Sequence, residues 1–543
     1  MLYFIPAWYQ KNEWNENEQN WYMRRMHTEF DDTVKQIQLF HRSKAYPYQM
    51  ILLSYAPNFR HFLHRQGVYH APYWSCFDAI QEVTRKQATT LSFHNLNWPA
   101  DIEFEYTPFV VVAYLHGEKY AQIEFGEDGN PIMIDLYAKG KIQRRNYYDD
   151  RGFVSSTLLY DDEQCSHQDY LTEKGVWKLR RYEKDGHVEV NQKVPHYSLV
   201  YGGKTEQRNF KRKSYNSLEE VISEVLSAYV EKTTAEDLFC VAMHERHTIM
   251  LQRVLKDKKL ILSFFEERYD ISHRKEAKSL IEGANYLIAD SQENVQKIQN
   301  RLLKKLDNIV DITPFDSRVD FGISQQINVQ KILVPVDGMP DDVFEMLIKY
   351  LGLYLLQNEN AQIHLFTRQA QYGRKRQLLR MSREALEKAG LESDWAAEIQ
   401  NANKAENRLE EGVPVRFFVE KCVDELSVSK CMREQRIIVD MRPEVAELYL
   451  RITGISVGIP QIVYTETQFV EHGKNGMILQ DMSKLVEILD FYLGTLKNWN
   501  EAMVYSYELG QKYTTRMLIE KWKEVIERVR KDSNFTTGDT GLE

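Results

Sequence analysis

The sequence that decides the fold reads Thr453-Gly454-Ile455-Ser456-Val457-Gly458-Ile459-Pro460-Gln461-Ile462. Gly458 stands where a helix would end, because glycine accepts the left-handed backbone that closes a helix. Pro460 favours extended backbone and predicts a strand beginning beside it. A Gly/Asn loop then opens another strand, Glu471-His472-Gly473-Lys474-Asn475-Gly476-Met477-Ile478-Leu479. A helix, a tight turn and a buried strand in this order predict an α/β layer.

Upstream of this stretch, apolar runs alternate with helical periodicity in two further blocks. The first block covers residues 1–101 and the second covers 214–320. Strands that alternate with helices predict a parallel sheet. Ser217 and Glu220 also form a capping-box pattern at the start of one helix. The predicted elements are strands at Leu2–Pro6, Tyr48–Leu53, Asp237–Val241, Lys259–Phe264 and Tyr286–Asp290, and helices at Met23–Phe40 and Leu218–Val230.

Residues 102–213 have a different texture. Apolar and polar residues alternate in Ile102–Tyr106, and turn signals recur, among them Asp128-Gly129, Lys139-Gly140 and Lys174-Gly175. This pattern is typical of an antiparallel meander. The sequence therefore predicts an antiparallel β-sheet domain inserted into the first α/β domain.

A second α/β domain follows at residues 321–495. Its predicted strands include Lys331–Val336 and Pro460–Tyr464, and helices are predicted at Val343–Leu356 and 444–453. C-terminal helices at 496–532 return to the first domain, with one long helix over Ala502–Val529. A polar tail at 533–543 is predicted to be disordered.

Composition limits the function. The chain has 543 residues and a formal net charge of −9, which argues against naked nucleic acid as the main partner. No apolar run approaches the roughly 20 residues of a spanning helix, and the short apolar start predicts a buried strand rather than a signal peptide. Five scattered cysteines without a C-x-x-C pair favour a reduced cytosolic protein without a metal site, and no cofactor is expected.

These patterns resemble a known family. The Gly458–Pro460 turn and the Asn475-Gly476 loop are similar to the donor-sugar domain of GT-B glycosyltransferases, and Leu287–Gln292 fits the last strand of their first domain. Tyr147–Ser155 resembles the extended β-sheet domain of enzymes that start O-glycosylation of serine-rich repeat adhesins. The whole order of parts most resembles a non-enzymatic family: the first of three small accessory secretory proteins of the accessory Sec system of Gram-positive bacteria. The resemblance implies a GT-B-like fold of two Rossmann-like domains.

The sequence departs from the enzymes at their donor site. Retaining GT-B enzymes carry two glutamates that would fall at Val445 and Thr453, and Glu444 and Glu447 stand on other sides of the helix. Where those enzymes hold a diphosphate with Arg and Lys, this sequence places Asp337, Asp341 and Asp342, which would repel it. We therefore expect a protein that is not an enzyme.

By the resemblance, the chain is a cytoplasmic scaffold, peripheral at the inner face of the bacterial membrane. Its implied partners are two other accessory secretory proteins, the accessory Sec motor ATPase and channel, and a glycosylated serine-rich repeat adhesin. Two alternatives stay open: an active retaining GT-B glycosyltransferase, and the chaperone subunit of a glycosyltransferase pair.

Five residues are candidates for sugar binding in a cleft between the two α/β domains: His244, Glu245, Arg246, Gln461 and Asn475. The first three follow a predicted strand and could hydrogen-bond sugar hydroxyls. The alternative is that they are loop residues that cap the next helix. A basic cluster, Arg208 with Lys211-Arg212-Lys213, could contact anionic lipid, although a solvated loop is the simpler interpretation.

Overall fold

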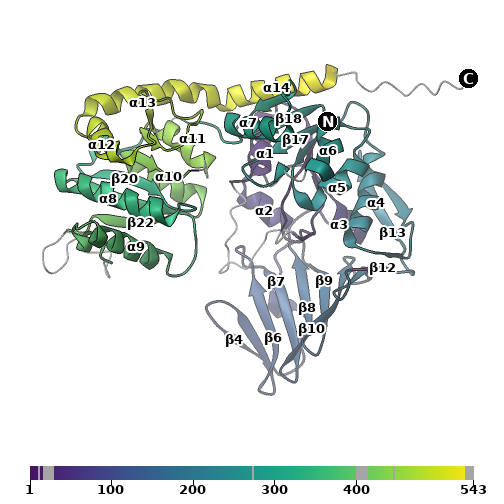
Figure 1. Cartoon of the computed structure of the whole chain (residues 1–543). Coiled ribbons are helices and arrows are strands. Elements are labelled where there is room, and N and C mark those ends of the chain that lie inside the picture. Colours follow the sequence, from purple (N-terminus) through teal and green to yellow (C-terminus); the bar gives the residue numbers. More distant parts are fainter. Residues whose placement is uncertain are drawn as a thin grey trace, which may run out of the picture.

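The computed structural model describes residues 1–9, 13–15, 30–271, 274–318, 320–398, 414–443 and 447–531. Two α/β lobes lie side by side, an antiparallel sheet hangs below the first lobe, and two C-terminal helices run across the top of both (Figure 1). The predicted tail at 533–543 lies outside the described residues.

The first lobe is built on a parallel sheet of seven strands in the order β19-β18-β17-β16-β1-β2-β3. The strands are apolar throughout because both faces of the sheet are covered, with one hydrophobic cluster on each face. The predicted strands in this block are confirmed. The bounds are β1 Leu2–Ile5, β2 Tyr48–Leu52, β3 Tyr73–Ser75, β16 Leu238–Ala242, β17 Lys259–Phe264, β18 Tyr286–Ala289 and β19 Ile309–Asp311.

The helices of the first lobe cover both faces of this sheet. Ser217 caps α4 as predicted, but Glu220 bonds the amide of Asn216 instead of closing the capping box on Ser217. Of the helix predicted at Met23–Phe40, residues 23–29 lie outside the described residues, and α1 runs from Asp32 to Ser43. The bounds are α1 Asp32–Ser43, α2 Phe59–Arg65, α3 Cys76–Gln81, α4 Leu218–Val230, α5 Glu245–Val254, α6 Arg274–Gly283 and α7 Gln292–Leu302.

The predicted meander forms an antiparallel sheet of ten strands, which we call the insert. One hairpin, β13 with β14, leaves this sheet and pairs only with itself, while β15 returns to pair with β12. The bounds are β4 Ile102–Tyr106, β5 Val111–Leu115, β6 Glu118–Phe125, β7 Pro131–Ala138, β8 Lys141–Asp149, β9 Phe153–Asp161, β10 Gln164–Leu171, β11 Trp177–Tyr182, β12 Val188–Val190, β13 His196–Tyr201, β14 Lys204–Asn209 and β15 Ser214–Tyr215.

Buried charges join the insert to the first lobe. The turn after β8 carries Asp149, Asp150 and Arg151, which are all at most 4% exposed. Arg60 of α2 bonds both aspartates, and Arg151 bonds Asp149 and Asp78 of α3. We call these five residues the insert joint.

The second lobe is a parallel sheet of six strands in the order β22-β21-β20-β23-β24-β25. The deciding stretch folds as predicted: α11 ends at Gly458, which has φ +74°, and β24 follows Pro460. A Cβ on Gly476 would lie 2.0 Å from the Gln461 carbonyl, so only glycine fits there. The bounds are β20 Gln330–Pro335, α8 Asp341–Gln357, β21 Ala361–Thr367, α9 Arg374–Lys388, β22 Phe417–Lys421, α10 Glu425–Glu434, β23 Ile437–Asp440, α11 Leu448–Val457, β24 Gln461–Val463, β25 Gly476–Ile478 and α12 Leu485–Leu493.

The single long C-terminal helix predicted over Ala502–Val529 is wrong. The structure has two helices, α13 Leu496–Gly510 and α14 Thr515–Lys531. The break falls where the linker between the lobes, residues 312–329, crosses, because the Ser317 amide bonds the Tyr513 carbonyl at 2.8 Å. Helix α14 packs Trp522 against Phe4 of the first lobe, so the chain returns to the lobe where it began.

Candidate functional site

The edge of the second lobe that faces the first lobe carries charged side chains after three neighbouring strands. Asp337 follows β20, Arg368 follows β21 and Arg442 follows β23, because the carboxyl ends of parallel strands meet at one edge. Asp337 accepts from the Thr367 hydroxyl and the Arg368 amide, each at 2.7 Å.

Four arginines gather at this edge, and a carboxylate lies beside each of them. The arginine cluster consists of Arg368, Arg374, Arg442 and Arg451, and their partners are Glu447, Asp337 and Asp440. Arg374 lies 3.3 Å from Asp337, and Arg368 lies 3.4 Å from Glu447. Arg442 and Arg451 both bond Asp440, at 2.8 and 2.7 Å.

The two buried carboxylates of this edge have pKa values shifted in opposite directions. Burial raises the pKa of Asp440, but the two arginines that bond it outweigh burial and hold the pKa below its usual range. For Glu447 burial prevails over Arg442 and Arg368, so its pKa is raised. One Glu447 oxygen, Oε2, has no hydrogen-bond partner among the described residues, although Arg442 lies 3.7 Å from it. Glu447 is therefore the poorly compensated carboxylate of the two.

This edge corrects one sequence expectation. Asp337, Asp341 and Asp342 were expected to leave the edge acidic and without a cation. The fold instead brings Arg368 and Arg374 to Asp337, while Asp341 and Asp342 are exposed in the first turn of α8, where carboxylates are favourable. Sequence reasoning missed these arginines because they follow a different strand from Asp337.

Aromatic rings fill the space between the lobes beside the arginine cluster. Phe30, Phe265 and Phe315 of the first lobe and the linker are each at most 9% exposed. Tyr449 of α11 lies 4.9 Å from Phe30 and 5.2 Å from Phe315, measured between ring centroids. We call these four residues the aromatic seam. The Arg368 guanidinium lies 3.7 Å above the Phe30 ring, so the seam also covers the arginine cluster.

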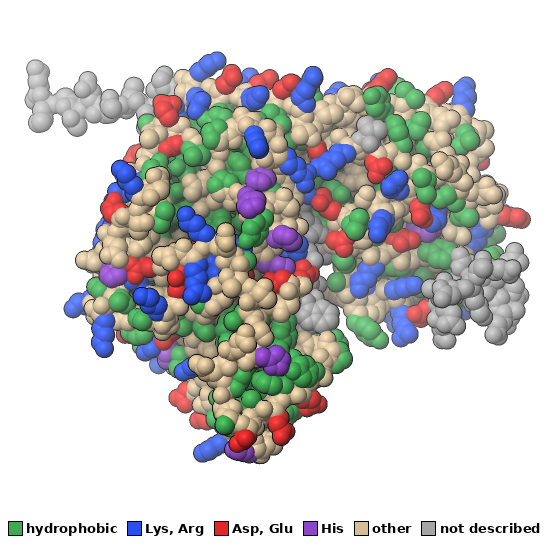
Figure 2. Space-filling view, turned by 180° about the vertical axis from the view of Figure 1, so that it is seen from behind, with side chains coloured by type: hydrophobic (Ala, Val, Ile, Leu, Met, Phe, Trp, Pro, Cys, Tyr) green, Lys and Arg blue, Asp and Glu red, His purple; other side chains and the backbone are tan. Residues whose placement is uncertain are grey.

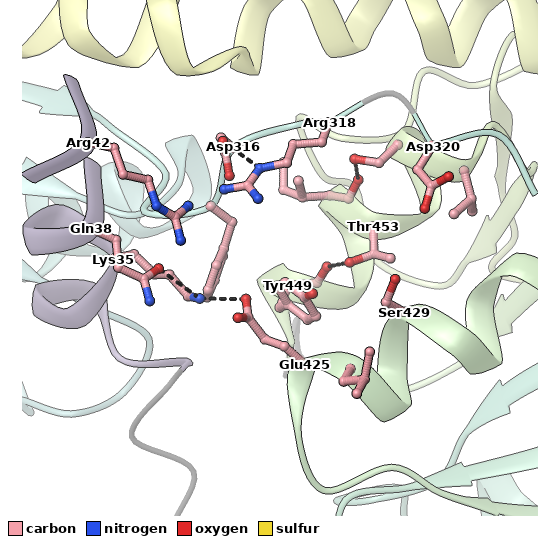
Figure 3. A pocket seen from close by; sticks show the side chains of 15 residues that line it. Lys35, Gln38, Arg42, Asp316, Arg318, Asp320, Glu425, Ser429, Tyr449 and Thr453 are labelled. Carbon is pink, nitrogen blue, oxygen red and sulfur yellow. Dashed lines mark hydrogen bonds and ion pairs between the residues drawn. The ribbon is translucent and has the colours of Figure 1, made fainter. Parts of the chain in front are cut away.

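A pocket of about 440 Å³ lies on the other side of Tyr449 (Figure 3). Its walls come from α1, the linker, α10 and α11. Lys35 of the first lobe reaches across to Glu425 of the second lobe at 2.5 Å, and Arg318 pairs with Asp316 at 3.0 Å. Thr453, where the enzymes would carry a glutamate, bonds the Tyr449 carbonyl. Its counterpart position, Val445, and Glu444 lie outside the described residues.

The predicted sugar-binding residues fall into two separate groups. His244 caps α5 by accepting from the Arg246 amide at 3.0 Å, and burial with the nearby Arg268 and Arg246 lowers its pKa to about 4. Glu245 is exposed, and Arg246 lies over the Trp14 ring. His244 therefore does cap the next helix, as the alternative interpretation held, while Glu245 beside it faces solvent.

The other two predicted residues hold the second lobe together. Gln461 and Asn475 are both 0% exposed. Gln461 donates to the Arg451 carbonyl, and Asn475 bridges Phe469 and Glu471 of its own loop. Neither side chain reaches solvent in this structure, so their part in the predicted sugar site has no support.

Two of the four residues in the basic cluster near the exit of the insert are paired with carboxylates, and Lys211, Arg212 and Lys213 are exposed. Arg208 pairs with Glu206 and Glu231, and Arg212 pairs with Glu220. Among the described residues, no helix is both long and apolar enough to cross a bilayer. In the same part of the chain, no group of three potential metal ligands was found.

Comparison with known proteins gives a consistent family. The family model of the accessory Sec system protein ASP1, the first accessory secretory protein, matches residues 1–529. The curated member of this family from Streptococcus gordonii is 33% identical over 532 residues, which cover 96% of this chain and 98% of that protein. A crystal structure of accessory secretory proteins 1, 2 and 3 of Streptococcus pneumoniae contains a chain that is 27% identical, with a TM-score of 0.78, covering 98% of this chain and 99% of that chain.

The fold comparison reaches a second class of protein. The pneumococcal O-GlcNAc transferase GtfA, solved with UDP and GlcNAc, matches with a TM-score of 0.68 at 13% identity, covering 98% of this chain and 99% of that chain. At that identity the likeness concerns the fold alone. The predicted GT-B-like fold is thereby confirmed.

Proposed function

Because this chain belongs to the family of the first accessory secretory protein of the accessory Sec system, we propose that it is a non-enzymatic scaffold subunit of the accessory Sec export machinery. It assembles with two other accessory secretory proteins, as the relative in the pneumococcal crystal structure does. The assembly works in the cytoplasm at the inner face of the membrane, with the motor ATPase and channel, on a glycosylated serine-rich adhesin.

The observation that carries the non-enzymatic part is the pairing of the arginine cluster with carboxylates of the chain. A nucleotide diphosphate needs cations that are free to face it. Here Arg374 and Arg442 pair with Asp337 and Asp440, and Arg368 lies between Glu447 and the Phe30 ring. The arginines of this edge are thus paired within the chain and are not free to hold a donor diphosphate. This arrangement supports a rigid scaffold more than an active glycosyltransferase.

Co-purification tests the assembly. The tagged full-length chain is purified from its native host together with whatever binds it, and the same host carrying the untagged chain serves as the background control. We expect the two other accessory secretory proteins in stoichiometric amounts. Recovery of a glycosyltransferase in their place would contradict the proposal and favour the chaperone alternative.

We further propose that the loop after β16 recognises sugars on the passing adhesin. It rests on exposed Glu245, the first residue of α5, and on His244, which is uncharged at neutral pH and has an N–H to offer. The purified assembly should prefer a glycosylated adhesin fragment over its unmodified form, and Glu245→Ala should reduce that preference. Ile249→Ala, on the same helix and 41% exposed, is the matched control. Equal binding of both fragments would refute the sugar proposal and leave the scaffold proposal intact.

A further inference from the structure

The insert ends in an open strand. β4 is the last strand in the order of the ten-stranded sheet and pairs with β5 alone among the described strands. It lies at the outer edge of the insert, on the side toward the second lobe (Figure 1). An edge strand presents a row of backbone groups to which another chain can bind.

The register shows which backbone groups of β4 point outward. Thr107 donates its amide to the Val110 carbonyl at 3.0 Å, which makes these two a hydrogen-bonded pair. In an antiparallel ladder such pairs alternate with non-bonded ones. The amides and carbonyls of Ile102, Phe104 and Tyr106 therefore face away from β5, at the open edge.

Exposed rings lie at one end of this edge, and a hollow lies inward of them, between the β4–β5 turn and the β6–β7 turn. Tyr106 is 63% exposed and Phe109 is 55% exposed. A shallow hollow of about 420 Å³ lies beside them, lined by residues 107–111 and by Phe125, Gly126, Glu127 and Gly129. Seen from behind, hydrophobic side chains gather on the insert, in the lower part of the molecule (Figure 2). The edge thus combines open backbone groups with the exposed ring of Tyr106.

The charged side chains of the β4 segment are acidic. Residues 101–118 contain Asp101, Glu103, Glu105 and Glu118 and no Lys or Arg. Glu103 and Glu105 alternate with Phe104, so both point to the same face of the sheet, and both are exposed. A strand paired with β4 would place its own side chains directly opposite these two carboxylates, where opposite charges stabilise and like charges repel.

We propose that the open edge of β4 binds an extended segment of another protein, which adds a strand to the insert, carries Lys or Arg opposite Glu103 and Glu105, and packs an apolar side chain against Tyr106. Backbone pairing supplies affinity and the side chains supply specificity, as in other strand-addition complexes. A second copy of this chain does not fit this chemistry, because two β4 strands would bring like charges together. The inference stands apart from the proposed function, since it concerns the chemistry of the bound segment and not its identity.

The probe is a fluorescent peptide of alternating lysine and valine that ends in phenylalanine, titrated with the purified full-length chain. Two control peptides accompany it: one with glutamate in place of lysine, and one with alternate backbone nitrogens methylated. We expect saturable binding of the basic peptide only. Equal binding of the methylated peptide would overturn the proposal, because backbone pairing would then be irrelevant. A failure of the basic peptide to bind would overturn it as well.

Variants of exposed residues locate the binding. Glu103→Lys with Glu105→Lys should weaken the basic peptide about tenfold, since two attractive cross-strand pairs become repulsive, and should create binding of the acidic peptide. Tyr106→Pro removes an outward amide without touching the ladder to β5, whereas Tyr106→Ala removes only the ring. The proline variant should therefore lose more affinity than the alanine variant. Unchanged binding in the double charge variant, or self-association of the chain that competes with the peptide, would contradict the assignment.

Discussion

The molecule joins its parts in two different ways. The insert joint is a buried charge network in which Arg60 and Arg151 each bond two carboxylates of fixed geometry. The aromatic seam between the lobes relies on ring contacts, supplemented by the Lys35–Glu425 ion pair. Each ring pair adds about 1 kcal/mol beyond the area that it buries.

The two joints differ in how strictly they fix the orientation of the parts that they connect. A bidentate arginine accepts one direction of approach, so the insert joint sets the angle of the insert on the first lobe. Ring contacts depend on buried area and tolerate small shifts, so the seam holds the lobes together with less control of angle. The insert, whose open strand we propose binds a partner, is therefore held by the joint that fixes its angle.

Removal of an insert-joint arginine should have the largest effect. Arg151→Met leaves Asp149 and Asp78 without their shared partner, and we expect a loss of about 3–5 kcal/mol in the free energy of unfolding. Arg212→Ala is the control, because Arg212 pairs with Glu220 but its side chain is 58% exposed; its loss should stay below about 1 kcal/mol. Denaturant unfolding measures both. Similar losses in the two variants would show that the insert joint contributes no more to stability than an exposed ion pair.

Opening the seam should cost somewhat less. Phe315→Ala removes a ring that is 3% exposed and contacts both Phe265 and Tyr449. We expect a loss of about 3 kcal/mol, at the lower end for a buried phenylalanine because the lobes can close around the gap. Limited proteolysis of the linker should accelerate in this variant, while cleavage of the insert should not. Faster cleavage of the insert would mean that the two joints are coupled.

Acid should act with opposite sign on the insert joint and on Glu447, which pairs with the arginine cluster. Burial raises the pKa of Asp78 but Arg151 outweighs it, so the folded pKa lies below the usual value. Asp78 therefore stabilises the fold above about pH 4, and its contribution disappears as the pH falls through the folded pKa. Glu447 has a raised folded pKa, so the fold gains stability as the pH falls from neutral through that pKa.

Asp78→Asn and Glu447→Gln separate these two effects. The wild type should be more stable than Asp78→Asn at neutral pH, and this difference in the free energy of unfolding should shrink below about pH 4. The difference between the wild type and Glu447→Gln should instead shift in favour of the wild type as the pH is lowered from about 7 toward about 4.3. Unfolding midpoints of the wild type and of each variant, measured over this pH range, show the sign of each effect. Histidine titration affects the wild type and the variant equally, so it cancels in the difference. Parallel trends for both variants would contradict the assignment.

The ion pair across the lobes should have the smallest effect. Lys35 is 7% exposed and Glu425 is 38% exposed, so water screens the pair on one side. A double-mutant cycle with Lys35→Met and Glu425→Gln should give a coupling of about 0.5–1 kcal/mol. A coupling energy as large as the loss of about 3 kcal/mol expected for Phe315→Ala would show that charge, rather than ring contacts, holds the lobes together.

The elements that were predictable are those with strong local signals. Gly458 and Pro460 located a helix end and a strand, and the turn signals located the insert, because backbone conformation there depends on the residue itself. The prediction of one long C-terminal helix was wrong because the break between α13 and α14 depends on Ser317, a residue of the distant linker.

The candidate site was less predictable because it is assembled from distant residues. Arg442 reaches the Asp337 carbonyl and Arg368 lies over Phe30, contacts between residues that are far apart in sequence. Gln461 and Asn475 were expected in the cleft because their neighbours match a donor-domain motif, but that motif also needs polar side chains to hold its own turns. Motif position alone does not distinguish a ligand contact from such a structural bond.

The most direct test of the central claim, that the chain's own carboxylates neutralise the arginine cluster so that it cannot hold a donor diphosphate, is thermal unfolding with increasing UDP-GlcNAc. A ligand at about 100 times its dissociation constant stabilises a protein by about 2.7 kcal/mol. The account predicts no shift of the unfolding temperature and no release of UDP at millimolar nucleotide sugar. A saturable upward shift in the wild type would contradict it.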